Sequence, residues 1–198
     1  MSKGERTRKD IIDKAFALAG DVGLEGLSLG TLASETGLSK SGLFAHFKSK
    51  EALQLSIIEE VSERFTNLVI RPTLAAPRGE CRVREYFARK IEWVSKSKPN
   101  GGCIYMALCQ EYDHREGPVR DLLVQNQQIL LGTIARIVQT AMDGGEFRKD
   151  LDPIRFAFEI EGITMAYSHI GKFIKDPQSL EHAKTTFEEL IMRSRVAG

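Results

Sequence analysis

The stretch Leu29–Phe47 reads LGTLASETGLSKSGLFAHF and has the pattern of two short helices joined by a tight turn. The first helix carries one apolar stripe, formed by Leu29, Leu32 and Ala33. Gly37 interrupts the pattern, and a second short helix begins at Ser39 with three apolar positions, Leu43, Phe44 and Phe47. Two short helices on either side of a glycine turn predict a helix-turn-helix.

The second of these helices begins with small and polar residues, which are Ser39, Lys40, Ser41 and Gly42. Such a surface suits contact with base edges in a major groove, so this helix is predicted to read DNA. Lys40 is the one long hydrogen-bond donor there. It could donate to O6 or N7 of a guanine, or it could contact a phosphate instead. Ser41 and Gly42 are small enough for close approach to the groove, and a helix start with exposed amides also suits a phosphate.

The rest of the chain contains helical patterns and no strand pattern. We call the predicted helix-turn-helix at Leu29–Phe47 the reader. A first helix from about Thr7 to Val22 is predicted to pack against the reader, and a fourth from Lys50 to about Leu68 is predicted to connect the reader to the remaining chain. Arg71–Pro72 and the residues up to Gly79 are predicted to break that fourth helix. The helices are expected to start at N-cap serines, which are Ser28, Ser39 and Ser49.

The penultimate helix carries two apolar faces. One is a heptad seam of Phe156, Ile160, Ile163, Tyr167, Ile170 and Ile174. The last helix has a matching seam of Leu180, Ala183, Phe187 and Leu190. We expect these two helices to form half of a four-helix bundle that a second subunit completes, giving a homodimer. The alternative is that both seams face the chain's own core.

The second face of that helix includes Met165, His169 and Phe173. The middle helices are expected to cover it with Trp93, Tyr105, Met106, Tyr112 and Gln127. An apolar, aromatic lining with few polar groups suits a small, mostly hydrophobic ligand held by a few hydrogen bonds. The alternative is an ordinary packed core with a few satisfied polar groups.

The first quarter of the chain resembles the DNA-binding domain of the TetR (tetracycline-repressor-like) regulators. The matching residues are Thr7-Arg8, Ile11, Ala15, Leu18, Gly23, Leu32-Ala33, Gly37-Leu38-Ser39-Lys40, Leu43-Phe44, His46-Phe47 and Ser49-Lys50-Glu51-Ala52-Leu53. The resemblance implies an all-α protein of about nine helices, with a three-helix helix-turn-helix domain at residues 1–49 and a larger ligand-binding and dimerisation domain at 50–198. It also implies a repressor that binds a double-stranded operator as a dimer and is released by an effector.

The resemblance extends to single positions in the reader. Ser28, Gly30 and Lys50 match positions that meet the DNA backbone in the family, and His46 matches a phosphate-contacting histidine. Phe44 stands where the family usually has a tyrosine that bonds a phosphate, so it is expected instead to pack or to touch a thymine methyl. Lys48 is expected to be a solvated charge near the DNA backbone.

The composition and motifs of the sequence argue against several other classes of function. The net charge is only +1, so affinity for phosphates has to come from local placement. No nucleophile with a base, metal-ligand cluster or phosphate-binding glycine loop is present, which argues against an enzyme, a cofactor or a metal site. No apolar run is long enough for a membrane span or a signal segment, so we expect a cytoplasmic protein.

Two other functions stay open from the sequence. One is a DNA-organising protein with the same reader, no effector and a filled second domain. The other is a thiol-based redox sensor that uses Cys103 or Cys109, although neither has an adjacent lysine or histidine to lower its pKa.

Overall fold

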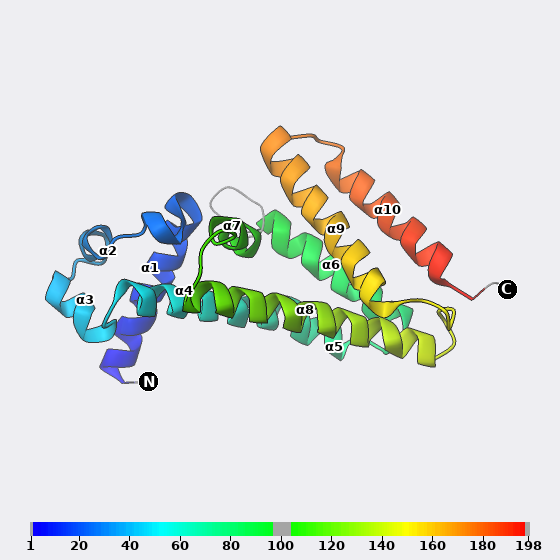
Figure 1. The fold of residues 1–198 in the computed structure, drawn as a ribbon, viewed down its shortest axis with the longest axis horizontal. Coiled ribbons are helices and arrows are strands. Elements are labelled where there is room, and N and C mark those ends of the chain that lie inside the picture. The colour runs from blue at the N-terminus through cyan, green and yellow to red at the C-terminus, as the bar shows by residue number, and fades with distance from the viewer. Residues whose placement is uncertain (1, 97–103, 197–198) are drawn as a thin grey trace. The chain divides into compact units, whose positions relative to one another are not determined.

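The computed structural model describes residues 2–96 and 104–196, which fold into helices (Figure 1). The first four are α1 (Lys3–Gly26), α2 (Leu29–Thr36), α3 (Lys40–His46) and α4 (Lys50–Phe65). A π-helical turn η1 (Thr66–Ile70), α5 (Arg71–Ala75), α6 (Glu80–Lys96) and α7 (Ile104–Glu111) follow. The last elements are α8 (Pro118–Asp143), α9 (Pro153–His169), a second π-helical turn η2 (Ile170–Ile174) and α10 (Ser179–Ser194).

The predicted all-α fold is confirmed. No strand forms among the described residues, whose one extended pairing is an isolated antiparallel bridge between Phe147 and Arg195. When each helix that runs through a π-helical turn is counted once, the described residues form nine helical segments. Within these ranges no helix combines the length and apolar character that crossing a membrane requires.

The chain forms two compact units, and their boundary differs from the predicted division at residue 49. The first unit contains the chain up to Arg64 together with Ile104–Gln125, so it includes most of α4 and all of α7. The second contains the chain from Phe65 through α6, together with Asn126 onward. The end of α1 is packed with α7, where Glu111 lies 87 residues after Leu24, and local patterns do not reveal this contact.

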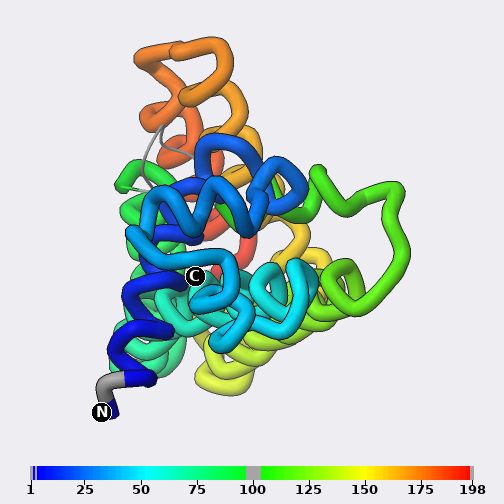
Figure 2. Tube along the Cα trace, turned by 90° about the vertical axis from the view of Figure 1, so that its left-hand side faces the viewer, coloured from blue at the N-terminus to red at the C-terminus, as the bar shows by residue number. Residues whose placement is uncertain are grey.

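Helix α1, blue in Figure 2, packs in the first unit through buried apolar side chains and makes charged contacts near its start. Ile11 and Ala15 are buried along its inner face. The Arg8 guanidinium lies over the Phe47 ring, 5.1 Å from its centroid, and donates to the Ser56 hydroxyl at 2.8 Å. Arg8 is exposed but makes both of these contacts within the unit, and the helix begins at Lys3 rather than near Thr7.

A kink at Gly23 interrupts α1. Gly23 has φ +75°, and the amides of Leu24 and Glu25 beyond it donate to the Glu111 carboxylate at 2.9 and 2.7 Å. A Cβ on Gly23 would lie only 2.8 Å from a Glu111 oxygen. Glycine is required here both for the backbone angle and for the space that the capping carboxylate occupies.

The predicted break at Arg71–Pro72 is wrong, because helical conformation continues from α4 through η1 to Ala75. A proline inside a regular α-helix loses a hydrogen bond and clashes with the carbonyl four residues earlier. The Arg71 amide instead donates to the Thr66 carbonyl, five residues back, so the turn before Pro72 is widened. The extra residue in that turn relieves the conflict.

In the second unit α9 contacts both α6 and α10, and α9 and α10 lie side by side (Figure 1). The Phe87 and Phe187 rings stack with centroids 3.9 Å apart. Lys90 is 3% exposed and its Nζ lies 3.0 Å from Oε2 of Glu161. The Tyr86 hydroxyl donates to the other Glu161 oxygen at 2.5 Å. A buried ion pair therefore sits in an otherwise largely apolar core.

The start of α6 is tied to α10 by a surface network. Arg195 donates to both oxygens of Glu80 at 2.6 and 2.7 Å, and Arg84 bridges Glu80 and Glu188. The hydrogen bond from Arg195, followed by the one from Arg84, lowers the pKa of the Glu80 carboxyl to about 2. The folded state therefore favours the charged carboxylate.

Candidate nucleic-acid interface

The two helices of the reader are set by their capping residues. The Ser28 hydroxyl accepts from the Thr31 amide at 3.0 Å at the start of α2. Gly37 ends that helix in the left-handed region, with φ +69°. The Ser39 hydroxyl then accepts from the Gly42 amide at 3.0 Å and caps α3. Each cap satisfies an amide that would otherwise lack a helical partner, so the boundaries of both helices follow from local chemistry.

Helix α3 presents one open face. Leu43 and Phe47 are buried under it. The exposed residues recur at positions that share a helix face, and they are Lys40, Ser41, Phe44 and Ala45. Phe44 is 48% exposed, so a large apolar ring stands on this open face. Ala45 was not predicted from the sequence, although its spacing of four residues from Ser41 was available as a signal.

Gly30 and Lys40 lie against each other across the helix-turn-helix. A Cβ built on Gly30 would be 3.5 Å from Cε of Lys40. The Lys40 stem therefore crosses the start of α2, and Gly30 leaves room for it. The remaining predicted DNA contacts are spread around the same unit, with Ser28 and Lys48 exposed and His46 partly buried.

The Lys50 side chain is already hydrogen-bonded within the chain, unlike a lysine that is free to bind a phosphate. Its Nζ donates to the Glu25 main-chain oxygen at 2.7 Å and to the Glu25 carboxylate at 3.1 Å. Lys50 begins α4, and its side chain remains 40% exposed. A phosphate that binds Lys50 would therefore have to compete with Glu25. No local sequence pattern indicates this pairing, because the two residues are 25 positions apart.

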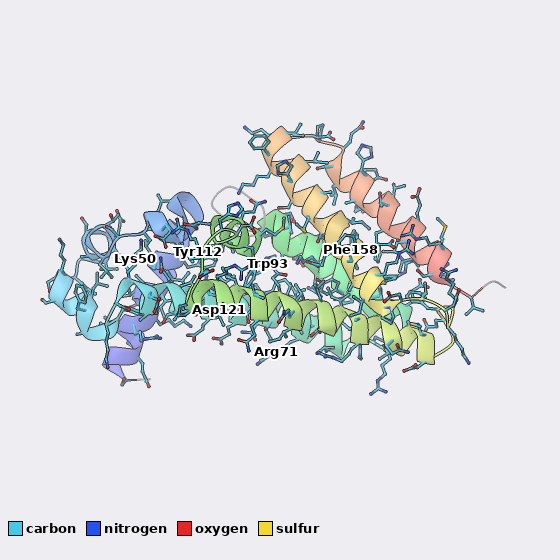
Figure 3. The ribbon with its side chains drawn as sticks, in the orientation of Figure 1. Lys50, Arg71, Trp93, Tyr112, Asp121 and Phe158 are labelled. Carbon is cyan, nitrogen blue, oxygen red and sulfur yellow. The ribbon has the colours of Figure 1, made fainter. Side chains whose placement is uncertain are left out.

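The Glu25 carboxylate is the centre of a polar cluster in the first unit. The Tyr112 hydroxyl donates to it at 2.7 Å and the Gln54 amide at 3.1 Å, with Arg115 3.7 Å away (Figure 3). The Tyr112 bond, with those from Lys50 and Gln54, lowers the pKa of Glu25 to about 2. Burial and the nearby Glu25 charge raise the pKa of the Tyr112 hydroxyl. Glu25 is therefore charged at any physiological pH.

Two family models match the chain. The model described as "Tetracyclin repressor-like, C-terminal domain" matches residues 79–187, more than half of the chain. The model "Bacterial regulatory proteins, tetR family" matches residues 11–57, which contain the helix-turn-helix. The chain belongs to the TetR family. It is accordingly a DNA-binding transcriptional regulator, as the resemblance of its first quarter implied.

Solved structures of the family share the fold. A TetR transcriptional regulator from Chloroflexus aurantiacus J-10-FL has a TM-score of 0.90 at 24% identity, with 100% of both chains covered. A TetR-family regulator from Cytophaga hutchinsonii has a TM-score of 0.87 at 21% identity, covering 100% of this chain and 99% of the other. AibR in complex with isovaleryl coenzyme A and operator DNA has a TM-score of 0.76 at 20% identity, covering 95% and 99%. No curated protein matches the chain.

The residues predicted to line an effector pocket are divided between the two units. Tyr105, Met106 and Tyr112 belong to the first unit, whereas Trp93, Gln127, Met165, His169 and Phe173 belong to the second. Met165, His169 and Phe173 are exposed, and Phe173 is 79% exposed. The expectation that the middle helices cover them is corrected, because the inward face of α9 carries Ile160, Thr164 and Ser168 instead.

The predicted dimer seam is also divided. Five of its side chains are already buried within the chain and leave no area for a partner, and they are Phe156, Ile160, Ala183, Phe187 and Leu190. Ile163, Tyr167, Ile170 and Leu180 are partly buried, and Ile174 is exposed. The sequence showed two apolar faces on the helix but not which one the subunit itself covers.

The open surface of α9 and α10 contains a groove of about 460 Å³. Its α9 side is apolar except for Glu159 and includes Phe158, which is 74% exposed and labelled in Figure 3, and Gly162, beside which no atom fills the place of a Cβ. Its α10 side carries Ser179, His182 and Thr186. A large exposed ring beside an open glycine offers a projection and a recess on one surface.

The cysteines are only partly described. Cys81 is exposed and Cys109 is partly buried, while Cys103 lies outside the described residues. Within those residues no group of three or more histidine, cysteine or acidic side chains is arranged to hold a metal ion.

Proposed function

We propose that the protein is a repressor that binds a pseudo-palindromic operator as a homodimer and is released by a small, mostly hydrophobic effector. The observation that carries the DNA part is the open face of α3, where Lys40, Ser41, Phe44 and Ala45 stand on one side of a capped helix. Lys40 supplies a donor for guanine, and Phe44 with Ala45 supplies apolar contact for a thymine methyl. Ser28, Gly30, Ser39, Gly42, His46 and Lys48 are proposed to contact or fit the DNA backbone around it.

The experiment for this part compares Lys40→Ala with the wild type on the duplex that the wild type selects from a random library. A base contact predicts a loss worth about 1 to 3 kcal/mol that is confined to one base position. A phosphate contact predicts an equal loss on all sequences and a shallower salt dependence. Unchanged binding would remove Lys40 from the interface.

The dimer part is supported by the groove on α9 and α10. A two-fold axis through this surface would bring the Phe158 ring of each subunit to the recess beside Gly162 of the other, so one patch would complement itself. Ile163, Tyr167 and Ile170 from the predicted seam line the same groove. We therefore place the interface on this side of α9 rather than on the seam residues that are already buried.

Phe158→Glu tests this placement, and Ile154→Glu is its matched control. Both positions are exposed apolar residues on α9, but only Phe158 lines the groove. Phe158→Glu is expected to give monomers in sedimentation at micromolar concentration, because a charge in an apolar interface is costly. Ile154→Glu is expected to stay dimeric. A monomeric wild type would refute the dimer.

The effector part is supported by the fold that the chain shares with AibR, whose structure contains isovaleryl coenzyme A. In the second unit, Trp93 is buried and its ring meets the Phe65 ring edge-on, with centroids 5.5 Å apart. We propose Trp93 and Gln127 as the effector contacts of this unit. A hundredfold loss of operator affinity would need about 2.7 kcal/mol of coupling, within the usual allosteric range.

Trp93 is the single tryptophan of the sequence, so its fluorescence reports on this region directly. We would titrate isovaleryl coenzyme A into the protein, with coenzyme A as the matched control. A fluorescence change together with weaker DNA binding for the acyl ester alone supports an acyl effector. If neither quantity changes with this ester or with hydrophobic compounds, the effector-independent DNA-organising function is favoured.

A further inference from the structure

Lys50 stands where the reader joins the rest of its unit. Recognition helix α3 ends at His46, and Ser49 caps α4 because its hydroxyl oxygen accepts a hydrogen bond from the Ala52 amide at 3.0 Å. Lys48 is exposed beside it. A capped helix start with two lysines, next to a recognition helix, favours the binding of a DNA phosphate. However, Lys50 already forms an ion pair with the Glu25 carboxylate.

The contacts to Glu25 show how that charge is held. Lys50 Nζ uses two of its three protons on Glu25, one on the main-chain oxygen and one on the carboxylate. Tyr112 and Gln54 donate to the same carboxylate, so its position does not depend on Lys50. Because Gln54 lies on α4 and Tyr112 follows α7, two separate segments of the first unit hold the carboxylate in front of Lys50 before DNA binds.

The strength of this ion pair suits exchange. Both partners are more than a third exposed, at 40% and 35%, and pairs of this kind contribute at most about 1 kcal/mol. A DNA phosphate can replace the carboxylate as the partner of Lys50 at small cost. A phosphate that approaches the intact pair meets a nearly neutral group, and it gains little from it.

We propose that Glu25 is an internal competitor of the DNA backbone, a positioning residue that withholds Lys50 from phosphate and thereby limits operator affinity. This inference rests on the proposed DNA-binding function. Glu111 and Tyr112, at the end of α7, hold the end of α1 and the Glu25 side chain in place. The extent of the competition is therefore set by α7, a helix outside the helix-turn-helix.

Glu25→Gln is the test variant, since it removes the charge and keeps the shape and one acceptor oxygen. Glu51→Gln is the matched control, because Glu51 is an exposed carboxylate one residue from Lys50 and makes the same change in net charge. Binding is measured from 50 to 200 mM salt on the duplex selected by the wild type and on a random-sequence duplex. Thermal unfolding of each variant checks that it is folded.

One additional phosphate contact steepens the salt dependence of log K by about 0.9. Glu25→Gln is therefore expected to bind more tightly than the wild type, with an advantage that shrinks by about 3.5-fold between 50 and 200 mM salt. Lys50→Gln is expected to cost little in the wild type and to abolish the gain in the Glu25→Gln background. Glu51→Gln is expected to leave the slope unchanged.

Three results would overturn the proposal. The first is a folded Glu25→Gln variant that binds no more tightly or has an unchanged slope, and the second is an equal gain from Glu51→Gln. The third is a gain that survives the loss of Lys50. If the wild type selects no sequence, the operator function fails separately, and the slopes on random-sequence duplex still decide whether Glu25 competes for Lys50.

Discussion

A polar cluster around Glu25 in the first unit and the Lys90–Glu161 pair in the second differ in burial. In the first unit Glu25 receives donors from Lys50, Gln54 and Tyr112 and remains partly open to water. In the second, Lys90 and Glu161 pair inside the core, where the Lys90 side chain is almost completely buried. Exposed pairs exchange partners at little cost, whereas a buried charge that loses its partner is left in a medium that solvates it poorly.

This difference separates two roles for the same chemistry. The open cluster borders the reader and suits a contact that forms and breaks when DNA binds. The closed cluster joins α6 to α9 and suits a fixed connection between helices.

The largest effect is expected at the closed cluster. Glu161→Leu leaves the Lys90 ammonium buried without its carboxylate and should lower the free energy of unfolding by about 3 to 5 kcal/mol. The double variant Lys90→Met with Glu161→Leu replaces the pair by apolar side chains and should recover most of that loss. Urea unfolding measures both. Equal stability of the single variant and the wild type would show that this pair is not buried as described.

A smaller effect is expected at the kink in α1. Gly23→Ala strains a positive φ and pushes against the Glu111 carboxylate, so it should cost about 2 to 3 kcal/mol. Gly37→Ala is the matched control, because Gly37 has a similar φ of +69° but no atom within 4 Å of a Cβ. It should cost only about 1 kcal/mol. Equal losses in thermal unfolding would mean that Glu111 does not hold the restarted helix.

Acid should weaken the network at the start of α6. The folded pKa of Glu80 is about 2, below its ordinary value near 4.5, so its contribution is complete above pH 4.5 and is lost as pH falls towards 2. Allowing for solvent, that contribution is roughly 1 to 2 kcal/mol. The stability difference between wild type and Glu80→Gln should therefore shrink between pH 6 and pH 3 in urea unfolding. A constant difference would contradict the charged network.

The smallest effect is expected at the N-cap of the recognition helix. Ser39→Ala removes the acceptor of the Gly42 amide and should cost about 1 kcal/mol. Ser41→Ala, on the open face of the same helix, should change stability by less than about 0.5 kcal/mol. Chemical unfolding of both variants compares them. The opposite order would mean that Ser39 does not set the start of α3.

Local features of the structure could be predicted from the sequence and nonlocal ones could not. Ser28, Ser39 and Gly37 define the helix-turn-helix because caps and turns depend on residues a few positions apart. The predicted helix break at Pro72 was wrong, because the π-helical turn before it removes the clash and the lost hydrogen bond that proline causes in a regular α-helix. Two apolar faces on α9 left open which one the chain itself covers. The Glu25 partner of Lys50 comes from a distant helix, and spacing carries no sign of it.

We expect a dimer to present the open faces of two α3 helices to one operator. The most direct test is to select duplexes from a random library with the wild-type protein and to sequence those that bind. We expect an enriched inverted repeat whose half-site centres are about 34 Å, or a multiple of that, apart, with Lys40→Ala changing preference at one position in each half. A library that stays unenriched, or a single site without an inverted copy, would contradict it.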